Sequence, residues 1–324
     1  MKIPALAFSL AAVASLVAMA SLASGAALPA SGQTAPAPGA STFSVDAWQQ
    51  ELQGWRVARA HTIDAPDGWL TLTGLEWLKP GLNSLGAAPD SRIKLRVGAP
   101  DHLGLVTVSG STVQLLAPAG GFPADLTISG KPAREGPLTV DNLHPTVLAW
   151  HGISLAVLSR DNRYLLRIKD EDSPARTAFR GLYWYPPDPS YRVVANWIPY
   201  TPTHVEQIPT ILGTTLDLPS PGVARFILNG HTLELEPVLE DPAAKTLFFI
   251  LRDTTSTTTT YQAARFLHTG LPDHGLSQPG QLVLDFNRLE NPPCAYTQFA
   301  ICPLPPDQNR LPIDIEAGER RYQH

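Results

Sequence analysis

Residues 222–237 read GVARFILNGHTLELEP, and this stretch carries a strong local structural signal in a chain of 324 residues. Two apolar segments flank Asn229-Gly230, a pair that accepts the positive φ angles of a type I′ turn. The stretch therefore predicts a β-hairpin with strands at 222–228 and 231–237. Since hairpins build antiparallel sheets, it favours a β fold for the surrounding chain.

Short apolar segments bounded by turn residues extend over most of the chain, which contains 32 prolines and 24 glycines. They predict further strands at 69–75, 92–97, 103–108, 112–116, 126–128, 146–150, 153–160, 164–169, 191–198, 204–209, 246–252, 260–268 and 281–286. One helix is predicted at 43–61, where apolar residues recur about every 3.6 positions. The expected fold class is all-β: one helix, then an N-terminal sandwich, then a C-terminal β unit that is barrel-like or a sandwich.

Four segments are expected along the chain. Residues 1–26 have the charged start, apolar stretch and small-residue exit of a signal peptide, with an uncleaved N-terminal anchor as the alternative. Residues 27–42 are almost entirely Ala, Pro, Gly, Ser and Thr and are expected to form a disordered linker. The helix and first β unit span 43–142, and the second β unit spans 143–324 with a proline-rich capping tail. The protein is therefore expected to be exported, to the periplasm or the medium.

Charge and motifs exclude several classes of partner. The formal net charge is −5 and no run of basic residues exceeds Arg320-Arg321, so no nucleic-acid partner is expected. After signal removal no apolar stretch approaches the ~20 residues needed to span a bilayer. Phosphate-binding, dinucleotide-binding and common hydrolase motifs are absent, so no cofactor is expected. The nine histidines do not show metal-ligand spacing, and no metal site is expected. The pattern gives no oligomeric state.

Cys294 and Cys302 are the two cysteines of the chain. In an oxidising compartment they are expected to form a disulfide, because no other cysteine competes. Two reduced thiols packed in a core are the alternative.

Polar residues occupy predicted strands at positions where a plain core would hold none. Strand alternation groups Asp285 with Asn287 and Tyr261 with Arg265. The tail is expected to cover them. The predicted ligand-binding residues are Arg167, Asp170, Tyr261, Arg265, Asp285, Asn287, Arg288, Asn291 and Asn309. The alternative is that these charges pair with one another or face water.

Residues 81–86 (GLNSLG) and 89–95 (PDSRIKL) together resemble the opening of a forkhead-associated β-sandwich. That family reads phosphothreonine with an Arg directly after the glycine and with a Ser-x-x-His segment. Here Ala87 follows Gly86, and no Ser-x-x-His occurs before Gly130. The phosphopeptide chemistry is therefore not implied, and this unit is expected to be a scaffold.

The C-terminal third carries a more specific resemblance. Its motifs are 285–288 (DFNR), 291–296 (NPPCAY), 302–306 (CPLPP), 309–312 (NRLP) and 316–319 (EAGE). Together they resemble the signature of the bacterial and archaeal DUF1684 family, whose function is not established. The resemblance extends upstream through Arg265 and Asp253 to 179–182 (FRGL) and 68–70 (GWL).

The sequence does not define a reaction. The leading hypothesis is a small anionic or polyhydroxylated ligand bound in a polar pocket of the C-terminal β unit. The second is a hydrolase with a carboxylate general base and arginines that stabilise an oxyanion. The third is a structural protein of the cell envelope. Whether the protein is an enzyme is left open.

Overall fold

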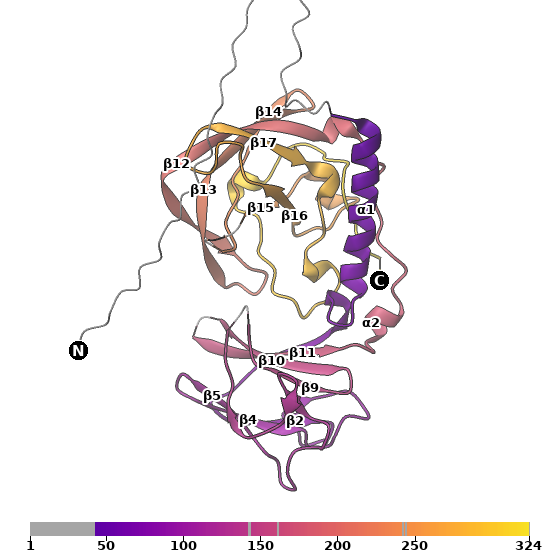
Figure 1. The fold of residues 1–324 in the computed structure, drawn as a ribbon, viewed down its shortest axis with the longest axis vertical. Helices are drawn as coiled ribbons and strands as arrows, with labels where there is room; N and C mark the ends of the chain where they lie inside the picture. The colour runs from indigo at the N-terminus through magenta and orange to yellow at the C-terminus, as the bar shows by residue number, and fades with distance from the viewer. Residues whose placement is uncertain (1–42, 142–143, 161, 242, 244, 324) are drawn as a thin grey trace, which may run out of the picture. The chain divides into compact units, whose positions relative to one another are not determined.

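Short strands dominate the structure, a computed structural model that describes residues 43–141, 144–160, 162–241, 243 and 245–323 (Figure 1). The signal peptide predicted for 1–26 and the linker predicted for 27–42 lie outside the described residues. So does the predicted boundary between residues 142 and 143, but the strands at 147–150, 153–160 and 163–170, which follow it, share a sheet with the strand at 72–77. The all-β class with a leading helix is confirmed.

The strands are β1 (Leu72–Trp77), β2 (Gly81–Gly86), β3 (Ile93–Lys94), β4 (Gly104–Ser109), β5 (Thr112–Leu116), β6 (Thr127–Ile128), β7 (Lys131–Pro132), β8 (Gly136–Pro137), β9 (Val147–Trp150), β10 (Ile153–Arg160), β11 (Arg163–Asp170), β12 (Arg192–Pro209), β13 (Thr215–Leu228), β14 (His231–Leu235), β15 (Thr246–Leu251), β16 (Arg265–Gly270) and β17 (Gly280–Asp285). The helices are α1 (Val45–Asp64) and α2 (Pro174–Thr177). Short 3₁₀ turns are η1 (Trp69–Thr71), η2 (Pro189–Tyr191), η3 (Thr254–Thr257), η4 (Phe286–Arg288), η5 (Pro293–Ala295) and η6 (Asp307–Asn309).

Helix α1 begins and ends at recognisable signals. Ser44 is its N-cap, and the Ser44 hydroxyl accepts a hydrogen bond from the main-chain nitrogen of Ala47. The helix ends at Asp64, and the next residue, Ala65, has a ψ of 153°, as expected for a residue that precedes proline. Trp48 and Leu52 lie one turn apart and are buried, so one face of the helix packs against the rest of the fold.

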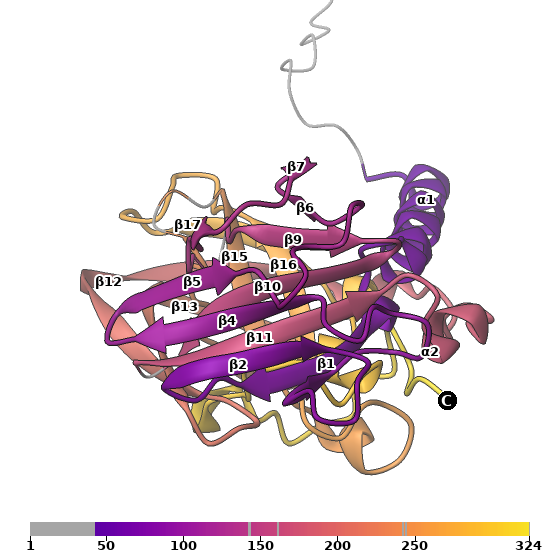
Figure 2. The same ribbon diagram turned by 90° about the horizontal axis from the view of Figure 1, so that it is seen from below.

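The N-terminal strands form two sheets that share one core (Figure 2). The five-stranded sheet has the order β3-β2-β4-β5-β8, and the six-stranded sheet has the order β1-β11-β10-β9-β6-β7. Leu85 and Val106 from the first sheet and Leu155 and Leu166 from the second belong to the same hydrophobic cluster. This arrangement is a β-sandwich.

The C-terminal strands form a four-stranded sheet, β14-β13-β12-β17, and a two-stranded sheet, β15-β16. The hairpin predicted at Asn229-Gly230 is confirmed, with φ angles of 51° and 80°. Strand β15 is buried on both faces, because Phe249 and Phe248 belong to two different hydrophobic clusters. Neither sheet closes on itself in the described part of the chain.

Some predicted strands differ from those observed. The segments predicted at 191–198 and 204–209 form one strand, β12, with a shift in register between Pro199 and His204. The segment predicted at 260–268 begins only at Arg265. A turn precedes it, in which the main-chain nitrogens of Thr258 and Thr260 donate to the oxygen of Thr255, and residues 260–264 are bent or irregular.

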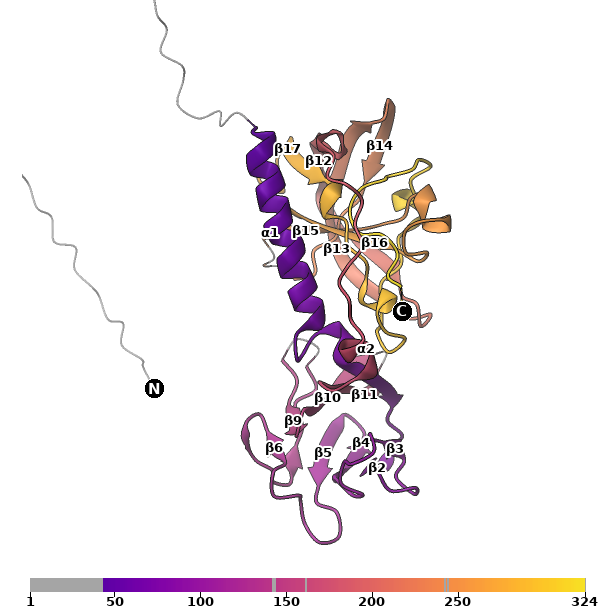
Figure 3. The same cartoon turned by 90° about the vertical axis from the view of Figure 1, so that its right-hand side faces the viewer.

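The tail after β17 is irregular and lies beside β15 and β16, drawn in yellow in Figure 3. Glu290 exchanges two main-chain hydrogen bonds with Phe266, each of 2.9 Å. Gly318 has a φ of 78°, and a Cβ atom there would lie 2.5 Å from the main-chain oxygen of Leu289, so only glycine fits. In the residues described, no helix is long and apolar enough to cross a bilayer.

Candidate functional site

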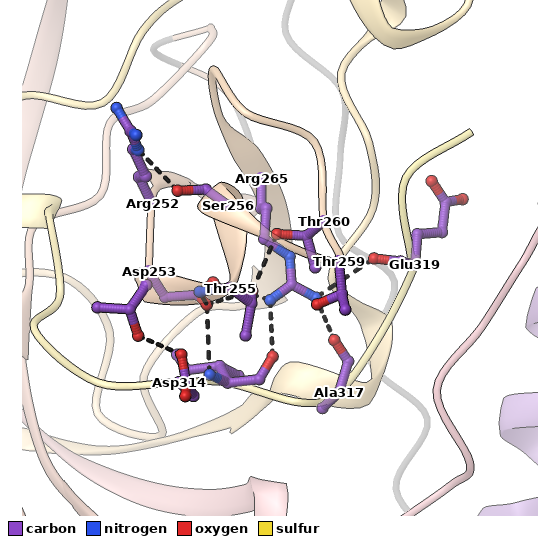
Figure 4. Close-up of polar contacts among 12 residues, drawn as sticks. Arg252, Asp253, Thr255, Ser256, Thr259, Thr260, Arg265, Asp314, Ala317 and Glu319 are labelled. Carbon is purple, nitrogen blue, oxygen red and sulfur yellow. Dashed lines mark hydrogen bonds and ion pairs between the residues drawn. The ribbon is translucent and has the colours of Figure 1, made fainter. Parts of the chain in front are cut away.

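Arg265, a predicted ligand-binding residue, lies at the start of β16 and is 1% exposed. Its Nη1 donates to Asp253 Oδ2 and to the main-chain oxygen of Ile315, both at 2.9 Å. Its Nη2 donates to the main-chain oxygens of Ala317 and Glu319 (Figure 4). We name this group of contacts the Arg265 centre. Because both terminal nitrogens already have acceptors, the guanidinium has little capacity left for a ligand.

The carboxylate of Asp253 is equally occupied and is 2% exposed. Its Oδ1 accepts from the main-chain nitrogens of Thr255 at 2.9 Å and Ile315 at 3.3 Å. The Thr255 hydroxyl donates to the same oxygen and shares a second hydrogen bond with the Thr260 hydroxyl. A buried ion pair with every oxygen occupied is typical of structural pairs. The Arg265 centre therefore anchors the tail to β16.

Glu319 forms a second buried centre and is 0% exposed. Its Oε1 lies 3.1 Å from Arg59 Nε on α1, and its Oε2 accepts from the Tyr296 hydroxyl at 2.7 Å and from the main-chain nitrogen of Asn291 at 2.6 Å. Burial raises the pKa of Glu319, whereas Arg59 and the two hydrogen bonds oppose that rise. Asn291, a predicted ligand-binding residue, thus holds a buried carboxylate.

Three predicted residues meet at the end of β17. Asp285 Oδ1 accepts from the main-chain nitrogen of Asn287 at 3.1 Å and from its Nδ2 at 3.0 Å, and Oδ2 accepts from Trp48 Nε1 at 2.7 Å. Arg288 Nε lies 3.7 Å from Asp285 Oδ2. Strand alternation does not bring these residues together, because β17 ends at Asp285 and the chain turns into η4. They meet through a local turn instead.

Three other predicted residues lie elsewhere, and two of them have partners outside the predicted set. Asp170 pairs with Arg96, at 3.1 Å between Arg96 Nε and Asp170 Oδ2. The Tyr261 hydroxyl donates to the main-chain oxygen of Cys294 at 3.1 Å. Arg167 is half-buried on β11, burial lowers its pKa, and it forms no ion pair with any described residue.

The Asn309 side chain forms hydrogen bonds with the main chain of the buried residue Glu236. Its Oδ1 accepts from the main-chain nitrogen of Glu236, and its Nδ2 donates to the main-chain oxygen of the same residue, each at 2.8 Å. Its Nδ2 also donates to the main-chain oxygen of Ile250 at 2.9 Å. Asn309 therefore fixes the position of Glu236 relative to β15.

The nine predicted residues thus fall into several groups. Among the described contacts, only Asp285, Asn287 and Arg288 bond directly to one another. Arg265 and Asn291 share Glu319 as a partner. Asp170 and Asn309 bond to residues outside the predicted set, and Arg167 forms no ion pair in the described part of the chain, so the single neighbourhood expected from the sequence is divided. A ligand-binding role for these residues stays a prediction.

Cys294 and Cys302 form a disulfide with their Cα atoms 6.2 Å apart, as predicted, and the alternative of two reduced thiols does not hold. The bond closes a short loop of the tail that includes η5. It lies in a small apolar cluster with Leu72 and Ala300, so it links the tail to the start of β1.

A small pocket near the end of the chain was not predicted. Its lining residues are Tyr183, Thr258, Thr259, Arg320, Arg321 and Gln323, and its volume is about 210 Å³. We name it the basic pocket. Main-chain hydrogen bonds hold its walls, from Arg320 N to Tyr183 O at 2.8 Å and from Arg321 N to Thr259 O at 2.9 Å. The one sequence signal for it is the adjacent pair of arginines.

A second feature missed by sequence reasoning is the group His204, Glu206 and Glu236, which we name the Glu236 cluster. His204 and Glu206 share a face of β12 because they are two residues apart. His204 Nε2 lies 2.7 Å from Glu236 Oε1 and 3.4 Å from Glu206 Oε2. The spacing of histidines and cysteines gives no signal for this group, because two carboxylates complete it and Glu236 comes from a different segment, directly after β14.

The other oxygen of Glu236 has ordinary partners. Glu236 Oε2 accepts from Gln308 Nε2 at 3.0 Å and from the Tyr200 hydroxyl at 3.3 Å. Burial and the Glu236 carboxylate raise the pKa of Tyr200 to about 12, so the phenol remains a neutral donor at physiological pH.

Comparison with known proteins identifies a family and a solved structure whose functions are not assigned. Residues 177–320 match the family described as "Protein of unknown function (DUF1684)". The solution NMR structure of an uncharacterized protein of Haloarcula marismortui is 32% identical, covers 45% of this chain and 78% of its own, and superposes with a TM-score of 0.39. No curated protein matches the chain. The forkhead-associated resemblance of residues 81–95 is not confirmed. The family match agrees with the motifs of the tail, and the chain belongs to the DUF1684 family.

Proposed function

We propose that the protein binds a small anion in the basic pocket. The observation that carries the proposal is a pair of consecutive arginines, Arg320 and Arg321, that line a hollow and are not neutralised. In the described part of the chain neither arginine forms an ion pair with a carboxylate. Two guanidinium groups offer planar donor pairs that suit a phosphate, a sulfate or a carboxylate.

The hydrogen bonds of the pocket leave donors available. Arg321 donates from Nε to the main-chain oxygen of Thr260 at 3.1 Å and from Nη2 to that of Ser256 at 3.3 Å, which orients the side chain without cancelling its charge. The Arg320 guanidinium lies 5.7 Å from the centre of the Tyr185 ring and has no hydrogen-bond acceptor among the described residues. An anion would supply that acceptor.

The size of the pocket limits the ligand. A volume of about 210 Å³ is below the ~300–1,000 Å³ typical of sites for drug-sized molecules. The pocket therefore suits an inorganic anion or a short carboxylate, or the anionic end of a longer ligand.

A larger hollow of about 560 Å³ supports ligand binding less well. Of its polar side chains, Ser173 donates to the main-chain oxygen of Leu70 and Thr297 donates to that of Leu72. The Tyr296 hydroxyl is bound to Glu319. Groups that already have partners gain little from a ligand, because each new contact replaces an existing one.

Binding of phosphate, sulfate and malonate at low ionic strength, measured by isothermal titration calorimetry, tests the proposal. We expect Arg320→Gln to weaken the affinity about tenfold or more, since a charge-assisted hydrogen bond contributes about 1.5–3 kcal/mol. Arg225→Gln is the matched control, because Arg225 is exposed and paired with Glu234 at 2.6 Å. Equal affinity in all three proteins, or no binding by the unmodified protein, would overturn the proposal.

We also infer that the protein is exported. The pattern of residues 1–26 is that of a secretory signal peptide, and disulfides such as Cys294–Cys302 persist in oxidising compartments. Mass spectrometry of periplasmic or secreted protein should find an N-terminus between Ser24 and Pro29. Exported protein that retains Met1 would contradict cleavage.

A further inference from the structure

We infer that His204, Glu206 and Glu236 bind one divalent transition-metal ion. The inference does not depend on the basic pocket. It rests on the geometry of three possible ligand atoms, on an unsatisfied buried oxygen and on the balance of charge around them.

The distances between the three side chains suit a shared ion. Their ligand atoms all lie within 4.8 Å of one another, with the closest pairs at 2.7 Å and 3.4 Å. Two ligand atoms that bind one zinc-sized ion at about 2.0–2.2 Å lie about 2.8–3.6 Å apart in tetrahedral or octahedral geometry. The separations of 2.7 Å and 3.4 Å are close to or inside that range, and the third, which is at most 4.8 Å, would shorten when an ion binds.

An unsatisfied oxygen points to the same conclusion. Glu236 is 7% exposed, and its Oε1 has no hydrogen-bond donor, although His204 Nε2 is 2.7 Å away. The nitrogen is close enough for a hydrogen bond but does not have the required direction. Among the described residues, this is the one buried carboxylate oxygen without a hydrogen-bond partner. Such an oxygen is costly unless a cation satisfies it.

A second unsatisfied group lies nearby. Ser220 pairs with His204 across the ladder of β12 and β13, so the two side chains share a face of the sheet. Ser220 is 0% exposed, and its hydroxyl has no hydrogen-bond partner. The hydroxyl is available to a ligand or to a water molecule bound to the ion.

The balance of charge favours a cation. Two carboxylates meet at the cluster, and no lysine or arginine among the described residues forms an ion pair with either one. Gln308 Nε2 donates to both, at 3.2 Å to Glu206 Oε1 and at 3.0 Å to Glu236 Oε2, and so holds the carboxylates side by side. Like charges held together repel unless a counter-ion lies between them.

The donor set indicates the class of metal. One imidazole nitrogen and two carboxylates suit Zn²⁺, Mn²⁺, Co²⁺ or Fe²⁺, whereas Ca²⁺ and Mg²⁺ prefer oxygen ligands alone. Three protein ligands leave at least one coordination position open, and the His204 side chain is 43% exposed, which gives solvent access to that position. Asn309, which binds the main chain of Glu236 on both sides, is a positioning residue for the ion.

The test is titration of the chelator-treated protein with Zn²⁺ by calorimetry and with Co²⁺ by visible absorption. We expect one ion per chain, and a loss of affinity of at least tenfold in His204→Gln and in Glu236→Gln. Glu206→Gln, on a partly exposed strand position, is a further variant if either of these fails to fold.

His268→Gln is the matched control. His268 also contacts two glutamates, but through different ring nitrogens: Nε2 lies 3.2 Å from Glu240 and Nδ1 lies 3.6 Å from Glu290. One ion cannot use both nitrogens of a ring, so this variant should bind as the unmodified protein does. The inference is overturned if the unmodified protein takes up no stoichiometric ion, or if His204→Gln and Glu236→Gln bind with unchanged affinity.

Discussion

The Arg265 centre and the Glu236 cluster both bury charge, but they differ in how that charge is balanced. In the Arg265 centre a guanidinium faces a carboxylate at 2.9 Å, and both oxygens of Asp253 accept hydrogen bonds. In the Glu236 cluster two carboxylates lie beside one histidine, and one buried oxygen has no donor. Burial alone therefore does not mark a functional group. The match between donors and acceptors distinguishes an anchor from a binding site.

The largest effect should come from breaking the Arg265 centre. We expect Asp253→Ala to lower the free energy of unfolding by about 3–5 kcal/mol, because it leaves a buried guanidinium without its counter-charge. Urea unfolding measures the change. Asp307→Ala removes the partner of Arg310 in an exposed ion pair of the tail, with 3.5 Å between Arg310 Nη2 and Asp307 Oδ1, and should cost about 1 kcal/mol or less. If the two variants lost similar amounts of unfolding free energy, the buried Arg265 centre would contribute no more to stability than an exposed ion pair.

Removing a carboxylate from the Glu236 cluster should have little effect on the free energy of unfolding, in contrast to the Arg265 centre. In metal-free protein we expect Glu236→Gln to change the free energy of unfolding by less than about 1 kcal/mol, or to raise it, because the amide keeps the shape and removes an unbalanced charge. Asp253→Asn, the equivalent change at the Arg265 centre, should destabilise clearly more. Urea unfolding of both variants compares the two regions directly. A large loss in metal-free Glu236→Gln would mean that the carboxylate is a structural partner like Asp253.

The smallest effect concerns His268. Burial alone would lower the pKa of His268, but hydrogen bonds to Glu240 and Glu290 raise it from 6.5 to about 9. Because the folded-state pKa is the higher one, the stabilisation is fully present below pH 6.5 and is lost as the pH rises to about 9. The ring is 38% exposed, so solvent screening limits the effect to about 1 kcal/mol or less. Unfolding curves at pH 6 and pH 9.5 should differ less in His268→Gln, and an unchanged difference would rule out this residue as the source.

The fold could be predicted where local chemistry decides it. Asn229-Gly230 specifies its turn, and the bounds of β10 match the prediction because the turns on either side define them. The prediction failed at residues 260–264, where apolar spacing suggested a strand. There the hydroxyls of Thr255 and Thr260 bond each other, and main-chain nitrogens bond Thr255, so a local turn replaces the strand.

The candidate sites could be predicted only in part. Asp285 and Asn287 were grouped correctly because they are neighbours in sequence, although a turn rather than a strand face joins them. The partners of Arg265 in the tail are main-chain oxygens, which every residue possesses and which therefore leave no sequence signal. The Glu236 cluster depends on the register between distant segments, and single-residue patterns do not encode that register.

The contacts of Arg265 with the tail have a consequence for how the family can vary. Arg265 bonds the main-chain oxygens of residues 315, 317 and 319, each two positions from the next, and bonds none of their side chains. Substitution at these positions leaves the bonds in place, whereas insertion or deletion of one residue between 315 and 319 would turn the wrong oxygens toward the guanidinium. The segment is thus constrained in length as well as by the requirements of Gly318 and Glu319, and an alignment of relatives should show few gaps there.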